Sequence, residues 1–249
     1  MKNKVVLITG GSRGIGAATA KLASKKGWAV CINYKNSQSQ ANQLVTEINA
    51  SDGIAIAVQA DVSIEKDVLR LFGTIDNKLG KLDALVNNAG IIAKQAKIVD
   101  IDIERLQRVF NTNIIGSFLC AREAVKRMST KHDGTGGSIV NISSSAARIG
   151  SPNEFIDYAA SKGAIDTMTL GLAKEVADEG IRVNAIRPGL IETEMHQDTG
   201  DVDRPLKMKD TIPMKRAGSA EEVANAIVWA MSEEASYVTG ALIDVAGGR

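Results

Sequence analysis

Two side chains that can exchange a proton stand four positions apart, at Tyr158 and Lys162, in a run whose spacing predicts a helix. Residues at i and i+4 share one helix face, so both can reach the same point. A free tyrosine, with a pKa near ~10, exchanges protons poorly at neutral pH, but a nearby ammonium favours its phenolate and lowers that pKa. The pattern predicts a tyrosine acid/base assisted by a lysine, although such a pair alone is usually a surface feature.

A glycine-rich turn, Thr9–Gly16, follows the apolar run Val5–Ile8 and precedes a helical pattern. Glycines let the backbone approach an anion, and the free amides of a helix N-terminus point toward it. The spacing Gly-x-x-x-Gly-x-Gly is neither the commoner dinucleotide fingerprint nor a P-loop. Any strand-to-helix connection could contain such a turn, but we expect this one to hold nucleotide phosphates through Gly10, Ser12, Arg13, Gly14, Ile15 and Gly16.

The fold that positions these two segments is indicated by short apolar runs that alternate with longer amphipathic runs. This alternation is typical of βα units and a parallel sheet covered by helices on both faces. The expected strands are Val5–Thr9, Ala29–Asn33, Ile54–Gln59, Ala84–Asn87, Ser138–Ile142, Arg182–Ile186 and Ala241–Val245. The expected helices are Ile15–Lys26, Gln38–Ala50, Ile64–Leu79, Ile103–Ser129, Tyr158–Glu179 and Ala220–Met231. We predict a Rossmann-type, doubly wound α/β fold with a seven-stranded sheet, in one domain over residues 1–249.

One stretch departs from this alternation. Residues Glu192–Ile212 are polar and irregular. A long insertion of this kind in a compact domain is usually a functional loop or lid. We therefore expect a substrate loop at about residues 190–213, with a mobile surface excursion as the alternative.

Composition excludes several classes of function. The 249 residues carry 30 basic and 29 acidic side chains, a net charge of +1, so no global field attracts nucleic acid or an anionic membrane. No segment approaches the ~18 apolar residues of a membrane span, and we expect a cytoplasmic protein. Cys31 and Cys120 lie in apolar patterns, and neither His132 nor His196 has a ligand cluster beside it, so we expect neither a disulfide nor a metal site.

The order of the motifs resembles the short-chain dehydrogenase/reductase family over nearly the whole chain. The resemblance rests on the first turn, on Asn87-Asn88-Ala89-Gly90, on Asn113, and on Ser145, thirteen residues before Tyr158. It implies hydride transfer between nicotinamide C4 and the carbonyl carbon of a small-molecule carbonyl or alcohol substrate. Tyr158 would give the proton in reduction and take it in oxidation.

The resemblance also implies roles for the neighbours of Tyr158. Ser145 would hydrogen-bond the substrate oxygen and stabilise the alkoxide-like charge that develops on it. Ser143 and Ser144 could take this role instead, but the thirteen-residue spacing favours Ser145.

Lys162 would hold the nicotinamide ribose in addition to assisting the tyrosine. Asn113 would anchor a water that links Lys162 to solvent and so completes a proton relay. Asn111 lies close enough in the sequence to compete with Asn113 for this assignment.

The second expected strand is not followed by the acid that binds the ribose 2′-hydroxyl of NAD, since the chain reads Asn33-Tyr34-Lys35-Asn36-Ser37. A carboxylate there would repel a 2′-phosphate. Lys35 and Arg13 could neutralise such a phosphate, and Asn33 and Ser37 could donate hydrogen bonds to it. We expect NADP(H) to be preferred over NAD(H), with Tyr34 in the same site; the alternative is that Arg13 and Lys35 are ordinary solvated charges.

Other residues that follow strands complete the implied cofactor site. Asp61 and Val62 would hold the adenine; Asp61 could instead cap a helix, but Ser63 is better placed for that cap. Asn87 could hold the sheet through its amide, and the Pro-Gly pair after the sixth strand could be a plain turn. The ribose and nicotinamide ends would be lined by Asn87, Ala89, Gly90, Pro188, Gly189, Ile191 and Thr193.

The substrate is left open among several classes that the resemblance includes, namely acyl carrier protein thioesters, sugars, polyols and steroids, within a glucose-dehydrogenase-like or 3-oxoacyl-reductase-like branch. A reductase for the acidic carrier protein should carry positive charge near its site. The evidence is mixed, because basic residues end one helix whereas Glu175, Asp178 and Glu179 end the helix of Tyr158. An NAD-dependent sugar dehydrogenase and a non-catalytic NADP-binding sensor or scaffold are further alternatives.

A homo-oligomer, either a dimer or a tetramer, is expected from apolar residues on two helices. Phe118, Met168, Leu170 and Leu172 could pack across a two-fold interface, and the tail Gly240–Gly248 could meet another subunit. The alternative is that these side chains face their own sheet.

Overall fold

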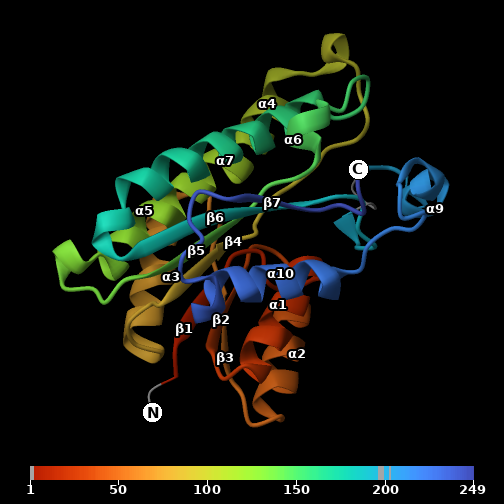
Figure 1. Ribbon diagram of the computed structural model, residues 1–249. Coiled ribbons are helices and arrows are strands. Elements are labelled where there is room, and N and C mark those ends of the chain that lie inside the picture. The colour runs from red at the N-terminus through yellow and green to blue at the C-terminus, as the bar shows by residue number, and fades with distance from the viewer. Residues whose placement is uncertain (1–2, 196–198, 202) are drawn as a thin grey trace.

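The centre of the molecule is a sheet of seven parallel strands in the order β3-β2-β1-β4-β5-β6-β7 (Figure 1). The computed structural model describes residues 3–195, 199–201 and 203–249. The strands are β1 (Val5–Ile8), β2 (Ala29–Tyr34), β3 (Ile54–Gln59), β4 (Ala84–Asn87), β5 (Gly137–Ile142), β6 (Ile181–Pro188) and β7 (Leu242–Val245). The strand order reverses between β1 and β4, where open α/β sheets bind ligands beyond the carboxyl ends of their strands.

Helices cover both faces of the sheet, so the predicted doubly wound fold is confirmed (Figure 1). One face carries α1 (Gly14–Lys25), α2 (Gln38–Asn49) and α10 (Ala220–Met231). The other carries α3 (Glu65–Lys78), α4 (Ile103–Phe110), α5 (Gly116–Met128) and α7 (Ile156–Glu175). Two short helices, α6 (Ala146–Ile149) and α9 (Arg204–Met208), lie in connecting segments.

The central strands are mainly apolar because both faces of the sheet are buried there. In β1, Val6 and Ile8 pack into the core under α1, α2 and α10, whereas Val5 and Leu7 pack into the core under α3, α5 and α7. Successive strand residues point to opposite faces, and burying one aliphatic side chain stabilises the fold by about 1.5–3 kcal/mol. The sheet is thereby fixed between two cores, and its strand ends become a rigid platform for the site.

Two expected helices differ from those in the structure. The expected helix Ile103–Ser129 is divided by a π-helical turn, Asn111–Ile115, that joins α4 to α5. The helix expected over Tyr158–Glu179 begins earlier, at Ile156, and ends at Glu175, before Gly180 adopts a left-handed backbone (φ +74°). Hydrophobic spacing continues through a π-turn, and π-turns occur frequently at functional sites.

Two of the apolar residues expected at a subunit interface belong to the core. Met168 is buried and Leu172 packs against the cores beside it, so the expectation is wrong for these two. Phe118 and Leu170 are exposed, at 50% and 40%. No helix in the described part of the chain has the length and apolar character needed to cross a bilayer.

Candidate active site

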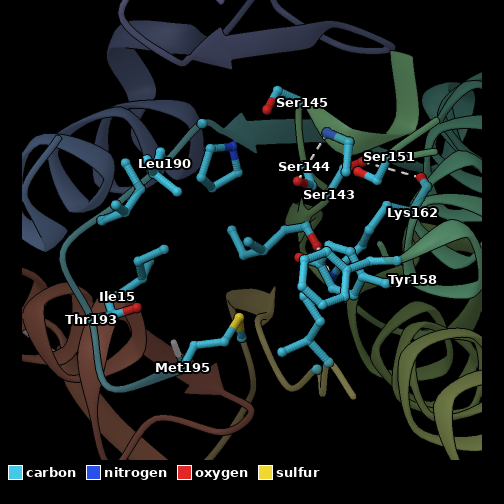
Figure 2. Close-up of a pocket in the computed structure, with 18 of the residues that line it drawn as sticks. Ile15, Ser143, Ser144, Ser145, Ser151, Tyr158, Lys162, Leu190, Thr193 and Met195 are labelled. Atoms are coloured by element: carbon cyan, nitrogen blue, oxygen red, sulfur yellow. Dashed lines mark hydrogen bonds between the residues drawn. The ribbon is translucent and has the colours of Figure 1, made fainter. Parts of the chain in front are cut away.

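Tyr158 and Lys162 lie one turn apart on α7, at the wall of a cavity that β5, β6 and α1 also border (Figure 2). The Lys162 Nζ atom donates to the carbonyl oxygen of Ile142, at 2.7 Å. The same nitrogen lies 5.6 Å from the centroid of the Tyr158 ring. The end of β5 therefore holds the lysine beside the tyrosine.

The acid–base properties of this pair are set mainly by burial. Burial raises the pKa of Tyr158 to about 12, against a hydrogen bond with Ser144 that lowers it. Burial also lowers the pKa of Lys162 to about 8, against the charge of Asp166, which raises it. The expectation that Lys162 lowers the tyrosine pKa is therefore wrong in this structure, because a low dielectric disfavours both the phenolate and the ammonium.

Ser144 is the serine whose side chain hydrogen-bonds with Tyr158, and its Oγ also accepts from the Ala146 amide at 3.1 Å. Ser145 has helical backbone angles (φ −56°, ψ −24°) immediately before α6, and its amide donates to the carbonyl of Pro188 at 2.9 Å. Figure 2 shows the Ser145 hydroxyl directed away from Tyr158. Ser145 also lines the cavity, so which serine contacts the substrate stays a prediction, and the hydrogen bond with Tyr158 favours Ser144. The third serine, Ser143, donates to the carbonyl of Lys162 at 3.1 Å.

Asn113 is fully buried in the π-helical turn and braces the loop after β4. Its Oδ1 accepts from the Ile91 amide at 2.8 Å, and its Nδ2 donates to the Ile91 carbonyl and to Ser161 Oγ, both at 3.0 Å. A Cβ on Gly90 would lie 3.3 Å from Lys162 Nζ and 3.5 Å from Asn113 Oδ1. Asn113 and the lysine thus meet at Gly90, and the water relay remains a prediction.

The glycine-rich turn is held in shape by Asn88, which the sequence interpretation did not single out as a site residue. Asn88 Nδ2 donates to the carbonyls of Thr9 and Gly10, at 2.9 and 3.0 Å. Thr9 Oγ1 in turn accepts from the amides of Asn88 and Ala89, both at 3.0 Å. Gly10 has φ +57°, and a Cβ there would lie 2.9 Å from the Ala89 backbone. The turn is therefore built by contact between the ends of β1 and β4.

Two of the residues expected at the cofactor pack within the protein instead. Asn87 Nδ2 donates to the Ser117 carbonyl at 3.2 Å and to Asn141 Oδ1 at 3.0 Å, which is the sheet-holding alternative. A Cβ on Gly16 would lie 2.6 Å from Asn88 Nδ2, so this glycine permits close packing.

A long groove runs from the glycine-rich turn past the ends of β2 and β3, and it gathers most of the predicted cofactor residues. Such a groove, with glycines where a side chain would fill the cradle, fits an extended dinucleotide. Predicted residues that line it are Gly10, Ser12, Arg13, Gly14, Ile15, Asn33, Tyr34, Lys35, Ser37, Asp61, Val62, Ala89, Gly90 and Thr193. Pro188, Gly189 and Ile191 line the cavity of Tyr158, which Thr193, Ile15 and Gly90 border as well.

The groove residue Asn33 does not direct its amide toward a ligand. Its Nδ2 donates to the carbonyls of Val58 and Ala60, at 3.3 and 3.0 Å, and its Oδ1 accepts from the Gly10 amide at 3.2 Å. The expectation that Asn33 donates to a 2′-phosphate is therefore wrong in this arrangement, because both of its amide hydrogens are used to join β2 to β3.

An ion pair lies at the end of this groove, where Lys35 Nζ is 2.6 Å from Asp61 Oδ2. Asp61 Oδ1 accepts from the amide and the hydroxyl of Ser63, at 3.0 and 2.7 Å. Burial alone would raise the pKa of Asp61, but these hydrogen bonds hold it below its ordinary value. Ser63 does not cap α3, whose N-cap position is Ile64 without a side-chain cap.

Several residues of the Tyr158 cavity were missed by the sequence interpretation, and most of them are apolar. They come from the loop after β4, from α6, from the loop before α7, from the substrate loop and from the segment after β7: Ile92, Ile149, Ser151, Phe155, Leu190, Met195, Thr199, Arg204 and Arg249. No chemical motif marks such residues, since only the fold brings them together. Residues 196–198 and 202 of the expected substrate loop, His196 among them, lie outside the described residues.

The described residues contain no group of three or more His, Cys, Asp or Glu side chains placed to hold a metal ion. Both cysteines are buried. Burial raises the pKa of both thiols, to about 12 for Cys120. Their thiols therefore stay protonated at neutral pH.

Comparisons with known proteins agree with this geometry. A family model described as enoyl-(acyl carrier protein) reductase matches residues 10–249. The chain is 54% identical over 245 residues to the uncharacterized oxidoreductase YgfF of Escherichia coli (strain K12), covering 98% of this chain and 99% of that protein. It is 41% identical over 248 residues to glucose 1-dehydrogenase 2 of Bacillus subtilis (strain 168), covering 100% and 95%.

A third relative, the 3-oxoacyl-[acyl-carrier-protein] reductase of Synechocystis sp. (strain ATCC 27184 / PCC 6803 / Kazusa), is 39% identical over 246 residues, covering 98% of this chain and 96% of the relative. The crystal structure of a dehydrogenase/reductase from Sinorhizobium meliloti 1021 superposes with a TM-score of 0.91 at 31% identity, over 100% of this chain and 95% of that one. The chain belongs to the short-chain dehydrogenase/reductase family of oxidoreductases, whose members use nicotinamide cofactors.

Proposed function

We propose that this protein is an NADP(H)-dependent oxidoreductase that interconverts a small carbonyl compound and its secondary alcohol. The observation that carries the proposal is the convergence of Tyr158, Lys162 and Ser144 in one cavity that shares Gly90 with the cofactor groove. When bound, the nicotinamide supplies or accepts the hydride at its C4.

The chain's own groups handle the substrate oxygen and its proton. Ser144 donates a hydrogen bond to that oxygen and stabilises the negative charge that develops on it. Tyr158, which burial keeps protonated, donates the proton in reduction and accepts it in oxidation. Lys162 lies in the same cavity, oriented by Ile142, and its lowered pKa suits it to proton exchange near neutral pH.

The preference for NADP(H) rests on the end of the groove beyond β2. Neutral Asn33 stands at the end of β2, and Lys35 places an ammonium in the groove with Ser37 beside it. A 2′-phosphate would compete with Asp61 for that ammonium, whereas a 2′-hydroxyl would find no carboxylate at the end of β2 to accept its hydrogen bond. Asp61 and Val62 would face the adenine.

A homo-oligomer is proposed from an exposed apolar surface on α4, the π-turn and the helices that follow. Ile103, Ile115, Phe118 and Leu170 are between 40% and 58% exposed. Covering such a surface in a two-fold contact removes apolar area from water. Light scattering on the purified protein should give a dimer or tetramer, and a monomer would contradict this part of the proposal.

The function is tested by following NADPH oxidation against a panel of keto esters, diketones, aldehydes, sugars and steroids, with Tyr158→Phe as the matched control. We expect turnover with at least one class and a loss of about 10²–10⁴-fold in the variant, the range for a removed acid/base. NADPH binding, measured by fluorescence, should be retained. Turnover that survives in Tyr158→Phe would overturn the mechanism, and binding without turnover in either direction would favour a sensor.

A further inference from the structure

One wall of the substrate cavity is held by a contact between three loops, which we call the loop clasp and define by Arg204, Glu154 and Gln95. Arg204 donates from Nη1 to Glu154 Oε1 at 2.9 Å and from Nη2 to Oε2 at 2.6 Å. Gln95 Nε2 donates to Glu154 Oε1 at 3.2 Å, and the Ala96 amide donates to the Glu154 carbonyl at 3.0 Å. The clasp ties the substrate loop to the segments before α7 and after β4.

The Arg204 guanidinium is fixed in orientation as well as in place. Arg204 is 9% exposed, and its Cζ lies 5.1 Å from the centroid of the Phe155 ring. Both residues line the cavity that contains Tyr158. A planar guanidinium held by a two-pronged carboxylate contact and an aromatic face presents its remaining donors in fixed directions.

Those remaining donors have no protein acceptor among the residues that the structure describes. The contact with Glu154 uses one hydrogen from each Nη atom, which leaves the Nε hydrogen and one on each Nη. Arg204 lines the cavity, so a ligand that brings an acceptor oxygen to this wall would satisfy these donors.

The charges of Arg204 and Glu154 determine whether the acceptor oxygen of a ligand should be neutral or anionic. Glu154 neutralises Arg204, so an anionic substrate would be repelled by a carboxylate already seated on the guanidinium. A neutral oxygen meets no such repulsion. The rest of the wall, including Leu190, Met195 and Ile92, suits an apolar frame around that oxygen.

The geometry points to Arg204 as a specificity-determining residue, which donates a hydrogen bond to a second, non-reacting oxygen of a neutral substrate. A β-keto ester or a diketone has this chemistry, whereas a simple ketone of the same size lacks it. The inference rests on the proposed function, because it places the reacting carbonyl at Tyr158 and the second oxygen at the clasp.

The test compares a diketone with the monoketone of equal length, using kcat/KM in the wild type and in Arg204→Met. We expect the ratio of the two kcat/KM values to favour the diketone in the wild type and to fall about 10- to 100-fold in the variant, as for a lost hydrogen bond to a charged donor. Arg216→Met is the matched control, because Arg216 makes an equally forked pair with Glu222 away from the cavity. An unchanged ratio in Arg204→Met would overturn the inference.

The exchanged double variant Arg204→Glu/Glu154→Arg distinguishes a purely structural role of the clasp from a role in substrate binding. It keeps an ion pair between the loops but removes the hydrogen-bond donors of residue 204. We expect it to regain the thermal stability of the wild type without regaining the diketone preference. Recovery of the preference would show that only loop anchoring matters. A β-keto acid that outcompetes the neutral diketone would overturn the neutral class.

Failure of the inference is kept apart from failure of the proposed function by a binding measurement. Calorimetric titration of diketone and monoketone into NADPH-saturated Tyr158→Phe, with and without Arg204→Met, needs no turnover. A diketone preference in binding that Arg204→Met removes would support the clasp even for a protein without reductase activity. Equal affinities in both backgrounds would overturn it even for an active enzyme.

Discussion

The cofactor groove and the substrate cavity meet at Gly90, but they are built by different means. The groove is shaped by backbone, with Asn88 holding the turn through the Thr9 and Gly10 carbonyls. The cavity is shaped by side chains from loops, which the Arg204–Glu154 pair draws together. A site formed by backbone tolerates only residues that can adopt its conformation. A site formed by side chains can change its shape by substitution, while the sheet beneath it keeps its structure.

This difference teaches where selectivity resides. Phosphates and ribose are common to every nicotinamide dinucleotide, so a rigid groove suits them, and the hydrogen bonds of Asn88 rigidify it. Substrates differ in shape, so we expect the loops around Tyr158 to select among them. The catalytic contact, the groove and the cavity should therefore respond separately to substitution.

The largest separation is expected between two adjacent serines. Ser144→Ala should lower kcat by about 10²–10³-fold, the range for one lost donor to a developing oxyanion. Ser145→Ala should change kcat less than about threefold, since its hydroxyl is directed elsewhere (Figure 2). NADPH affinity should be the same in both variants. The reverse order of the two effects would restore the choice made from residue spacing.

The groove should respond to a single methyl group. In Gly10→Ala, the added Cβ would lie 2.9 Å from the Ala89 backbone at a φ of +57°. We expect NADPH affinity to fall by about 5- to 150-fold, corresponding to about 1–3 kcal/mol of strain, with a lowered melting temperature. Gly73→Ala in α3 is the control, because nothing lies within 4 Å of its added Cβ. Equal effects of both changes on NADPH binding would contradict a backbone-built groove.

The two reaction directions should differ in pH dependence. Because the pKa of Tyr158 is raised to about 12, its phenolate fraction increases about tenfold per pH unit between pH 7 and 9. The kcat/KM for alcohol oxidation, which needs the phenolate, should rise with a slope near one on logarithmic axes. The kcat/KM for carbonyl reduction, which needs the phenol, should stay level over that range. A plateau in oxidation below pH 8 would show that the operative tyrosine pKa is much lower.

The smallest effect is expected at the exposed end of the groove. Lys35→Ala should weaken NADPH binding about five- to tenfold and leave NADH binding nearly unchanged, because the Lys35 side chain is 59% exposed and its charge is screened. Lys21→Ala is the control, since Lys21 is a comparably exposed, ion-paired lysine outside the groove. Equal losses for NADPH and NADH would remove the basis for the NADP(H) preference.

The sheet and its helices were predictable from the sequence because the pattern reflects burial directly. All four β1 residues are buried between two helical layers, so their run is apolar without alternation. The π-helical turn was not predictable, since Asn111–Ile115 continues the spacing of the helices around it. The short helix α6 was missed because four residues carry no readable period.

The site was predictable only where chemistry and sequence spacing coincide. Tyr158 and Lys162 share a helix face, so their proximity follows from position alone. The direction of the Tyr158 pKa was misjudged because burial cannot be read from one helix. The Arg204–Glu154 contact joins residues fifty positions apart, and the Asn33 amide is consumed by β3. Such pairings depend on the packing of separate segments.

The position of β1 between β2 and β4 has a consequence for the order of folding. The glycine-rich turn takes its hydrogen bonds from Asn88, about eighty residues further along the chain. Closing so long a loop is entropically costly and slow compared with local helix formation. We therefore expect the glycine-rich turn to be completed late, when β4 docks against β1, and a nascent chain that ends before Asn88 to bind a nucleotide poorly.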